Sequence, residues 1–186
     1  MKTAIVKLKS VSPYSQSKHY TTEKLNKEIP KDYEARTWRD RLHTIEATGE
    51  VFIPPMSFKN CLSEAAKFLG IQIPGKGKST YTKHFEAGVL VTDALHLGIK
   101  ASDVKGEWLF VPSDGVRGSG KRVDKCFPVI HEWGGEVTFH ILDETITEEV
   151  FLNVLQQAGA FIGIGRFRPR NNGFYGRFTV ESVKWN

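Results

Sequence analysis

The sequence predicts an α+β protein with a mostly antiparallel sheet and basic loop insertions. Residues 3–11 and 136–142 alternate apolar and polar side chains, which is typical of half-buried strands. Residues 57–70 and 147–158 place apolar side chains at helical spacing. Strands surround both segments, and the chain shows no internal repeat and no low-complexity linker, so we expect helices packed on one antiparallel sheet.

Length, charge and cysteine content limit the class of protein. A chain of 186 residues suits one domain, or at most two small ones, and buries enough surface to fold without disulfides. We therefore expect Cys61 and Cys126 to be buried free thiols. The chain has no apolar run of about 18 residues, and its first residues lack the apolar core of a signal peptide, so we expect a cytoplasmic protein without membrane contact. The net charge of +5 permits an acidic partner without requiring one.

The first half of the chain predicts a strand, a charged insertion, a hairpin and a helix. Ala4, Val6 and Leu8 share the apolar face of the first strand. Residues 21–43 are highly charged and weakly periodic, which is typical of a solvated insertion. Residues 43–53 read as a hairpin, and Ser57 is the expected N-cap of a helix that Gly70 ends.

The second half predicts more strands around a second helix. Strands are expected at 88–92 and 107–111, and the next strand should turn Val137, Phe139 and Ile141 inward. Thr147 is the expected cap of the second helix. Two further strands, at 160–166 and 174–183, are expected on either side of a glycine-arginine loop.

Five basic segments alternate lysine or arginine with glycine or aromatic residues. They are 14–20, 36–43, 75–84, 115–125 and 163–177. The stretch 161–178 is the strongest, with four glycines, four arginines and no acidic residue. Arginine forks recognise phosphate and aromatic faces stack on bases, so these segments predict binding to a single-stranded nucleic acid, RNA or DNA.

The residues expected to contact nucleic acid come from all five segments and from the start of the first helix. They are Lys18, His19, Arg36, Trp38, Arg39, Arg41, Lys59, Lys76, Lys78, Arg117, Lys121, Arg122, Arg166, Arg168, Arg170, Tyr175 and Arg177.

Other motifs argue against an enzyme, a metal and a cofactor. Gly115-x-x-x-x-Gly120-Lys121 matches most of a P-loop, but Arg122 stands where a magnesium-binding Ser or Thr is required. The six histidines show no metal-ligand spacing. One catalytic alternative stays open, because His19, His43 and His84 lie beside basic segments where a histidine can act as general base in RNA cleavage.

Two motifs resemble the RAMP superfamily of CRISPR effector complexes, above all its repeated backbone subunit, which polymerises along CRISPR RNA. Phe52-Ile-Pro-Pro-Met-Ser-Phe-Lys59 is similar to the proline-Ser-x-Lys strand-to-helix junction of that superfamily. Gly163-Ile-Gly165 through Gly173-Phe-Tyr-Gly-Arg177 is similar to its glycine-rich C-terminal loop. The junction departs from the pattern at Pro55 and Asn60, which stand where glycines are usual.

The resemblance implies a single RAMP-like domain over 1–186 with a modified ferredoxin-like, or RRM-like, core. It implies a charged insertion at about 14–43, a thumb-like loop at about 113–128, and single-stranded RNA running over the sheet face. It further implies head-to-tail homo-oligomers, as in a filament, and other CRISPR effector subunits as partners. A phage-encoded mimic that inhibits this antiviral defence, and a metal-independent endoribonuclease of the CRISPR type, are the alternatives.

Overall fold

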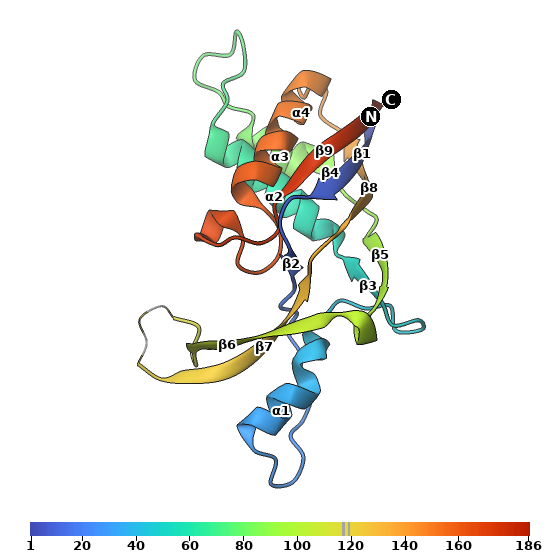
Figure 1. Cartoon of the computed structure of the whole chain (residues 1–186). Coiled ribbons are helices and arrows are strands. Elements are labelled where there is room, and N and C mark those ends of the chain that lie inside the picture. Colours follow the sequence, from blue (N-terminus) through green and yellow to red (C-terminus); the bar gives the residue numbers. More distant parts are fainter. Residues whose placement is uncertain (117, 119) are drawn as a thin grey trace.

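The computed structural model describes residues 1–116, 118 and 120–186 and shows an α+β fold (Figure 1). Its main sheet has four antiparallel strands in the order β4-β8-β1-β9. The strands are β1 (Lys2–Ser10), β4 (Val89–Leu90), β8 (Gly134–Ile141) and β9 (Phe178–Trp185). Helix α2 (Pro55–Leu69) lies between β1 and β4 in the sequence, and α4 (Glu148–Gln157) lies between β8 and β9. This βαββαβ order is ferredoxin-like, which confirms the expected core.

The core fills the space between this sheet and the two helices. Ala4, Val6 and Leu8 of β1 are buried, as are the three inward residues expected on β8. The rings of Phe139 on β8 and Phe151 on α4 meet edge to face at 5.3 Å. The period-two pattern therefore identified the core face of both central strands correctly.

The opposite face of the sheet carries polar side chains. In β1 this face presents Thr3, Ile5 and Lys7, which pair with His140, Thr138 and Glu136 of β8. No phenylalanine, tyrosine or tryptophan lies on this face in β1, β8 or β9, all of whose residues the structure describes. A strand of RNA running over this face would therefore find no stacking platform of these residues there.

Two paired strands form a long ribbon that projects from the body (Figure 1). Strand β6 (Lys105–Pro112) pairs with β7 (Arg122–Ile130) over its whole length, and the inner end of β7 also pairs with β2 (Tyr14–Ser15). We call β6, β7 and the residues between them the arm.

The remaining elements pack around the body and the base of the arm. They are α1 (Pro30–Thr37), the 3₁₀ turn η1 (Trp38–Arg41), β3 (Glu50–Ile53), α3 (Thr82–Gly88), β5 (Leu95–Lys100), η2 (Ala101–Asp103) and η4 (Pro169–Asn171). The expected hairpin over 43–53 is present as a bridge between Thr44 and Val51. The segment 21–43 is not wholly irregular, since it contains α1 and η1.

Several expected boundaries were wrong. The strand expected at 160–166 is instead a π-helical turn, η3 (Ala158–Ile162), in which the Gly163 N–H donates to the Ala158 carbonyl oxygen at 2.9 Å. Helix α2 begins at Pro55 rather than after Ser57, because a proline at the first helical position already has the required φ. Strand 88–92 shortens to β4, and strand 174–183 starts only at Phe178.

Both cysteines are free and buried, as expected. No helix among the described residues combines the length and the apolar character that crossing a membrane requires.

Candidate nucleic-acid interface

A cationic pocket of about 270 Å³ lies where four distant segments of the chain meet. Lys18 comes from the segment after β2, His43 follows η1, Ser57 belongs to the first turn of α2, and Arg166 comes from the glycine-arginine loop. Tyr14, Gln16, Ser17 and Gly165 complete the lining. The fold thus brings two predicted contact residues, Lys18 and Arg166, to one cavity beside the proline-Ser-x-Lys junction.

Arg166 is held at the wall of this pocket by several contacts. Its Nε donates to Ser15 Oγ at 3.1 Å, and its guanidinium carbon lies 3.8 Å from the centre of the Phe127 ring. Its Nη2 is buried, has no hydrogen-bond partner among the described residues, and lies 3.9 Å from a carboxylate oxygen of Glu107. Burial lowers the pKa of Arg166, but a guanidinium stays protonated at neutral pH. Glu107 offsets the charge of Arg166, and Lys18 adds a second cation, so the pocket keeps one net positive charge.

The glycines of the loop allow it to approach β2 closely. A Cβ atom at Gly165 would lie 2.5 Å from the Ser15 carbonyl oxygen and 2.5 Å from the Tyr14 ring, and its φ is +76°. At Gly176 a Cβ atom would meet the Ile164 carbonyl oxygen. These glycines serve close packing of backbone, which sets Arg166 at its position.

His43 is the neutral member of the pocket. Burial lowers the pKa of His43 and the nearby Lys18 ammonium lowers it further, so its imidazole is uncharged at pH 7. Its backbone N–H donates to Oε1 of the buried Gln16 at 2.6 Å, which fixes the residue at the pocket wall. His19 lies elsewhere, in a neighbouring hollow that also contains Lys18 and Arg39.

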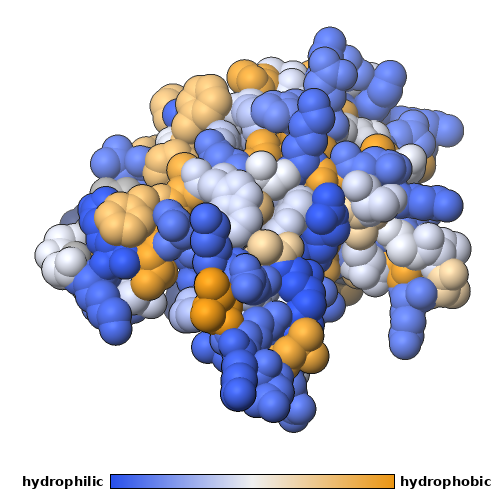
Figure 2. Space-filling model, turned by 60° about the horizontal axis from the view of Figure 1, so that its bottom comes forward, coloured by the Kyte–Doolittle hydropathy of each residue, from blue (hydrophilic) through white to orange (hydrophobic). Residues whose placement is uncertain are grey.

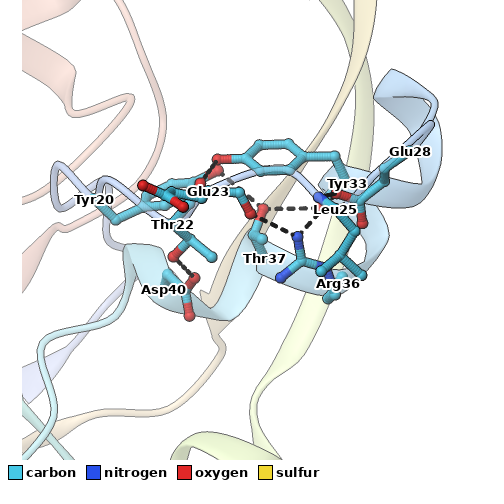
Figure 3. A network of polar contacts seen from close by, with 9 residues as sticks. All are labelled: Tyr20, Thr22, Glu23, Leu25, Glu28, Tyr33, Arg36, Thr37 and Asp40. Atoms are coloured by element: carbon cyan, nitrogen blue, oxygen red, sulfur yellow. Dashed lines mark hydrogen bonds and ion pairs between the residues drawn. The ribbon is translucent and has the colours of Figure 1, made fainter.

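Several predicted contact residues hold the fold together instead. In the segment 20–40, Arg36 donates twice to the Glu28 carboxylate, at 2.8 and 2.9 Å, and once to the Glu23 carbonyl oxygen (Figure 3). Lys59 donates to Ser63 Oγ and to the carbonyl oxygens of Phe85 and Glu86, at 2.7–2.8 Å. Its three ammonium protons are thus engaged within the molecule.

Arg41 closes the free edge of the arm. Its side chain is buried and pairs with the buried Glu34 carboxylate at 2.8 Å. Glu34 accepts the Cys126 N–H at 2.8 Å, while Arg41 donates to the Cys126 carbonyl oxygen at 3.2 Å. Lys125 also pairs with Glu34, at 3.1 Å. This buried pair satisfies backbone groups that a neighbouring strand would otherwise satisfy.

The other arginines of the C-terminal loop have partners as well. Arg168 and Arg170 share the Glu64 carboxylate, at 2.7 and 3.1 Å, so this trio carries one net positive charge. Arg177 donates to the carbonyl oxygens of Ala160 and Phe174. Tyr175 donates to Glu107 at 2.8 Å and thereby joins the loop to the base of the arm.

One face of the arm carries an aromatic row that the sequence reading missed. Trp108 and Phe110 are two residues apart on β6, so they share a face, and they are 47% and 61% exposed. Trp38 covers Gly106 on the same face, because a Cβ atom there would lie 3.1 Å from its ring. The Arg39 guanidinium stacks on Trp38 at 4.0 Å. Trp38, a predicted contact residue, is therefore buried, with only 7% of its surface exposed. We call the two exposed residues, Trp108 and Phe110, the aromatic row.

The strand pattern of β6 concealed these two aromatics. Leu109 and Val111 alternate with Trp108 and Phe110, so the run is apolar on both faces and suggests a buried strand. The paired strand β7 contained a sign that this face is exposed, since Asp124 and Arg122 pair with Phe110 and Pro112. Charged side chains on the same face indicate that this face is open to solvent.

The remaining predicted residues lie apart from the pocket. Lys121 and Arg122 are exposed near the tip of the arm, and Lys76 and Lys78 are exposed on the loop before α3. Arg117 lies outside the described residues. Figure 2, which brings the bottom of the molecule forward, shows a mostly hydrophilic face with hydrophobic side chains scattered over it.

Comparison with known proteins gives structural similarities but no sequence match. No protein-family model matches the chain, and no curated protein sequence matches it. Among solved structures, a chain described as a CRISPR RNA-guided surveillance complex aligns with a TM-score of 0.42 and 11% sequence identity. The alignment covers 98% of this chain and 68% of that chain. A TM-score of this size does not establish a shared fold.

Proposed function

We propose that the protein binds single-stranded nucleic acid, with RNA preferred, and does so without catalysis. The observation that carries this proposal is the convergence of Lys18, Arg166 and the first turn of α2 on one pocket. Two cations and two hydroxyl groups, from Ser17 and Ser57, suit a phosphate group of the backbone.

The aromatic row supports a single strand rather than a duplex. Every base offers a face for stacking, and only unpaired bases expose that face to a protein. Arg166 stacks on Phe127, which is opposite Glu107 and so lies on the other face of the ribbon from Trp108. A strand that contacts both the pocket and the aromatic row therefore crosses the base of the arm.

The proposal also covers the family relation of the protein and the assembly of its copies. The ferredoxin-like strand order and the position of Pro54 to Lys59 at the start of α2 support a relation to the RAMP superfamily. On that relation we propose that copies assemble head to tail along the strand and associate with CRISPR effector subunits.

The test compares three ligands of one sequence, namely single-stranded RNA, single-stranded DNA and duplex RNA, by fluorescence anisotropy. We expect the single strands to bind more tightly than the duplex. Trp108 is the most exposed of the four tryptophans, so its fluorescence should be quenched when bases stack on it. W108A should remove the quenching and weaken binding roughly tenfold. Equal affinity for all three ligands with no quenching would contradict the proposal.

His43 favours a second candidate function, a metal-independent endoribonuclease. Its neutral imidazole lies in the same pocket as Arg166 and Lys18. There a base that takes the 2′-hydroxyl proton would allow the 2′-oxygen to attack the adjacent phosphorus, with the bond to the 5′-oxygen of the next nucleotide breaking to leave a cyclic phosphate and a 5′-hydroxyl. Incubation of RNA hairpins with chelator tests this. If the protein is an endoribonuclease, it should cleave the hairpins, H43A should not cleave them, and H19A should still do so. Intact RNA with the original protein would rule this function out.

A further inference from the structure

A second concave site lies at the other end of α2. A hollow of about 580 Å³ is lined by Lys67, Ser79, Thr80, Thr82, Lys83, His84 and Glu86. Ser57 in the first pocket and Lys67 in this hollow are ten residues apart on one helix, or about 15 Å along its axis. The two sites are thus separate, and the hollow uses none of the residues of the Arg166 pocket.

His84 is fixed in this hollow by a carboxylate. Its Nδ1 lies 2.6 Å from Asp143 Oδ2, and Asp143 Oδ1 accepts the Thr145 N–H at 2.9 Å. Helix α3 and the segment after β8 are packed so closely that a Cβ atom at Gly88 would lie 2.5 Å from the Asp143 Cβ. A carboxylate on Nδ1 orients the imidazole and leaves Nε2 as its only free nitrogen.

The lysines around the hollow have no partners of their own. Among the residues that the structure describes, the ammonium groups of Lys67, Lys76, Lys78 and Lys83 form no hydrogen bond or ion pair. Lys78 directly precedes Ser79 of the lining, and backbone hydrogen bonds at Ile73 and Ser79 close the loop that carries Lys76 and Lys78. Glu86 and the Asp143 carboxylate balance the charges of Lys67 and Lys83, so the net positive charge near the hollow comes from Lys76 and Lys78 on the adjoining loop.

We propose that this hollow binds a phosphate group through Lys67, Lys83 and the Nε2–H of His84, which donates when the ring is an imidazolium held at Nδ1 by Asp143. Hydroxyl groups of Ser79 and Thr82 supply further donors for the phosphate oxygens, while the Thr80 hydroxyl donates to Thr82 Oγ1 at 3.2 Å. The proposal goes beyond the function proposed above, because it adds an anion site with different residues. The same chemistry fits the terminal phosphate of a nucleic-acid strand and free phosphate or a mononucleotide.

The hollow lies at the C-terminal end of α2, and this position limits its expected affinity for phosphate. The C-terminal end of a helix carries partial negative charge and repels an anion, and Lys67 in the last turn counters this repulsion. Inorganic phosphate alone should therefore bind weakly. A strand with a 5′-phosphate should bind more tightly than the same strand with a 5′-hydroxyl if the terminal phosphate is the ligand.

The test is titration of the whole protein with inorganic phosphate, adenosine 5′-monophosphate and 5′-phosphorylated or 5′-hydroxyl oligonucleotides. Binding is followed by calorimetry and by the NMR shifts of the His84 ring. K67A/K83A should weaken phosphate binding roughly tenfold or more, whereas K31A/K100A removes the same charge from exposed sites elsewhere and should not. H84N keeps an amide near the position of Nδ1, which can still donate to Asp143, so the variant should fold normally. Because it lacks Nε2, it should bind phosphate more weakly.

The outcomes separate this site from the Arg166 pocket. Tighter binding of the 5′-phosphorylated strand than of the 5′-hydroxyl strand identifies a strand terminus as the ligand. Equal binding of the two strands, together with saturable binding of the mononucleotide, identifies free phosphate or a mononucleotide as the ligand. Both support the site, even if long single strands do not bind. No saturable phosphate binding, or binding unchanged in K67A/K83A and H84N, overturns the proposal.

Discussion

Replacing Arg166 by methionine should weaken nucleic-acid binding without unfolding the protein. Hydrogen bonds to charged groups are worth about 1.5–3 kcal/mol, so loss of one guanidinium–phosphate contact predicts roughly 10- to 150-fold weaker binding. The slope of log affinity against log salt should also become shallower by about 0.7, the value for one phosphate contact on a single strand.

The stability of Arg166→Met follows from opposing contributions. The variant loses the hydrogen bond to Ser15 Oγ, about 1 kcal/mol, and the stacking on Phe127, about 0.5–2 kcal/mol. It also removes the buried Nη2, whose lack of a hydrogen bond costs about 1–3 kcal/mol and is only partly offset by Glu107 at 3.9 Å. The net change in the free energy of unfolding should be about 1 kcal/mol or less, which shifts the melting temperature by about 2–4 °C.

Fluorescence anisotropy with a labelled single-stranded 30-mer at several salt concentrations measures the affinity, and circular dichroism measures the melting temperature. Arg166→Lys keeps the charge but not the planar fork, so its affinity should be intermediate. Lys100→Met removes one charge from exposed β5 and should bind like the original chain. If Arg166→Met binds within twofold of the original with an unchanged salt slope, the pocket is not the phosphate site.

Three further predictions concern the framework of the site. Glu34→Gln leaves Arg41 buried without its counter-ion and should lower the free energy of unfolding, measured in urea, by about 3–5 kcal/mol. Glu46 is exposed, so Glu46→Gln should change that free energy little. Equal free energies of unfolding for the two variants would contradict the buried pair. Gly165→Ala places a Cβ atom 2.5 Å from the Ser15 carbonyl oxygen, so both melting temperature and binding should fall; unchanged values would mean that the loop is not packed on β2. The folded-state pKa of His43 is lowered, so the unfolded state binds more protons and stability should fall as pH drops below about 6.5. Part of that loss should disappear in His43→Gln, and an identical pH profile would show that His43 is not buried as described.

The fold was largely predictable because its central strands are half-buried. Alternation along β1 and β8 assigned the core face of each, and the helical spacing located α2 and α4. The apolar run Phe161-Ile-Gly-Ile164 misled because a short apolar stretch does not distinguish a strand from a buried turn of helix. Here the chain continues α4 through the π-helical turn η3.

The sequence predicted which segments are basic, but not which of their residues meet in one pocket. Nothing local in the sequence places Lys18 and Arg166 in one pocket, since the position of Arg166 depends on close packing at Gly165. Composition also does not reveal that Arg41 and Lys59 have partners inside the molecule, because Glu34 and the carbonyl oxygens of α3 approach them only in the folded chain.

The salt dependence of binding to a single-stranded RNA 30-mer tests the central claim most directly. If each protomer contacts about four phosphates, log affinity should fall with log salt at a slope of about −3, from about −0.7 per phosphate. Saturable binding with a slope near this value would support the cationic pocket and its neighbouring cations as the nucleic-acid interface. Absent binding, or binding that does not change with salt, would contradict it.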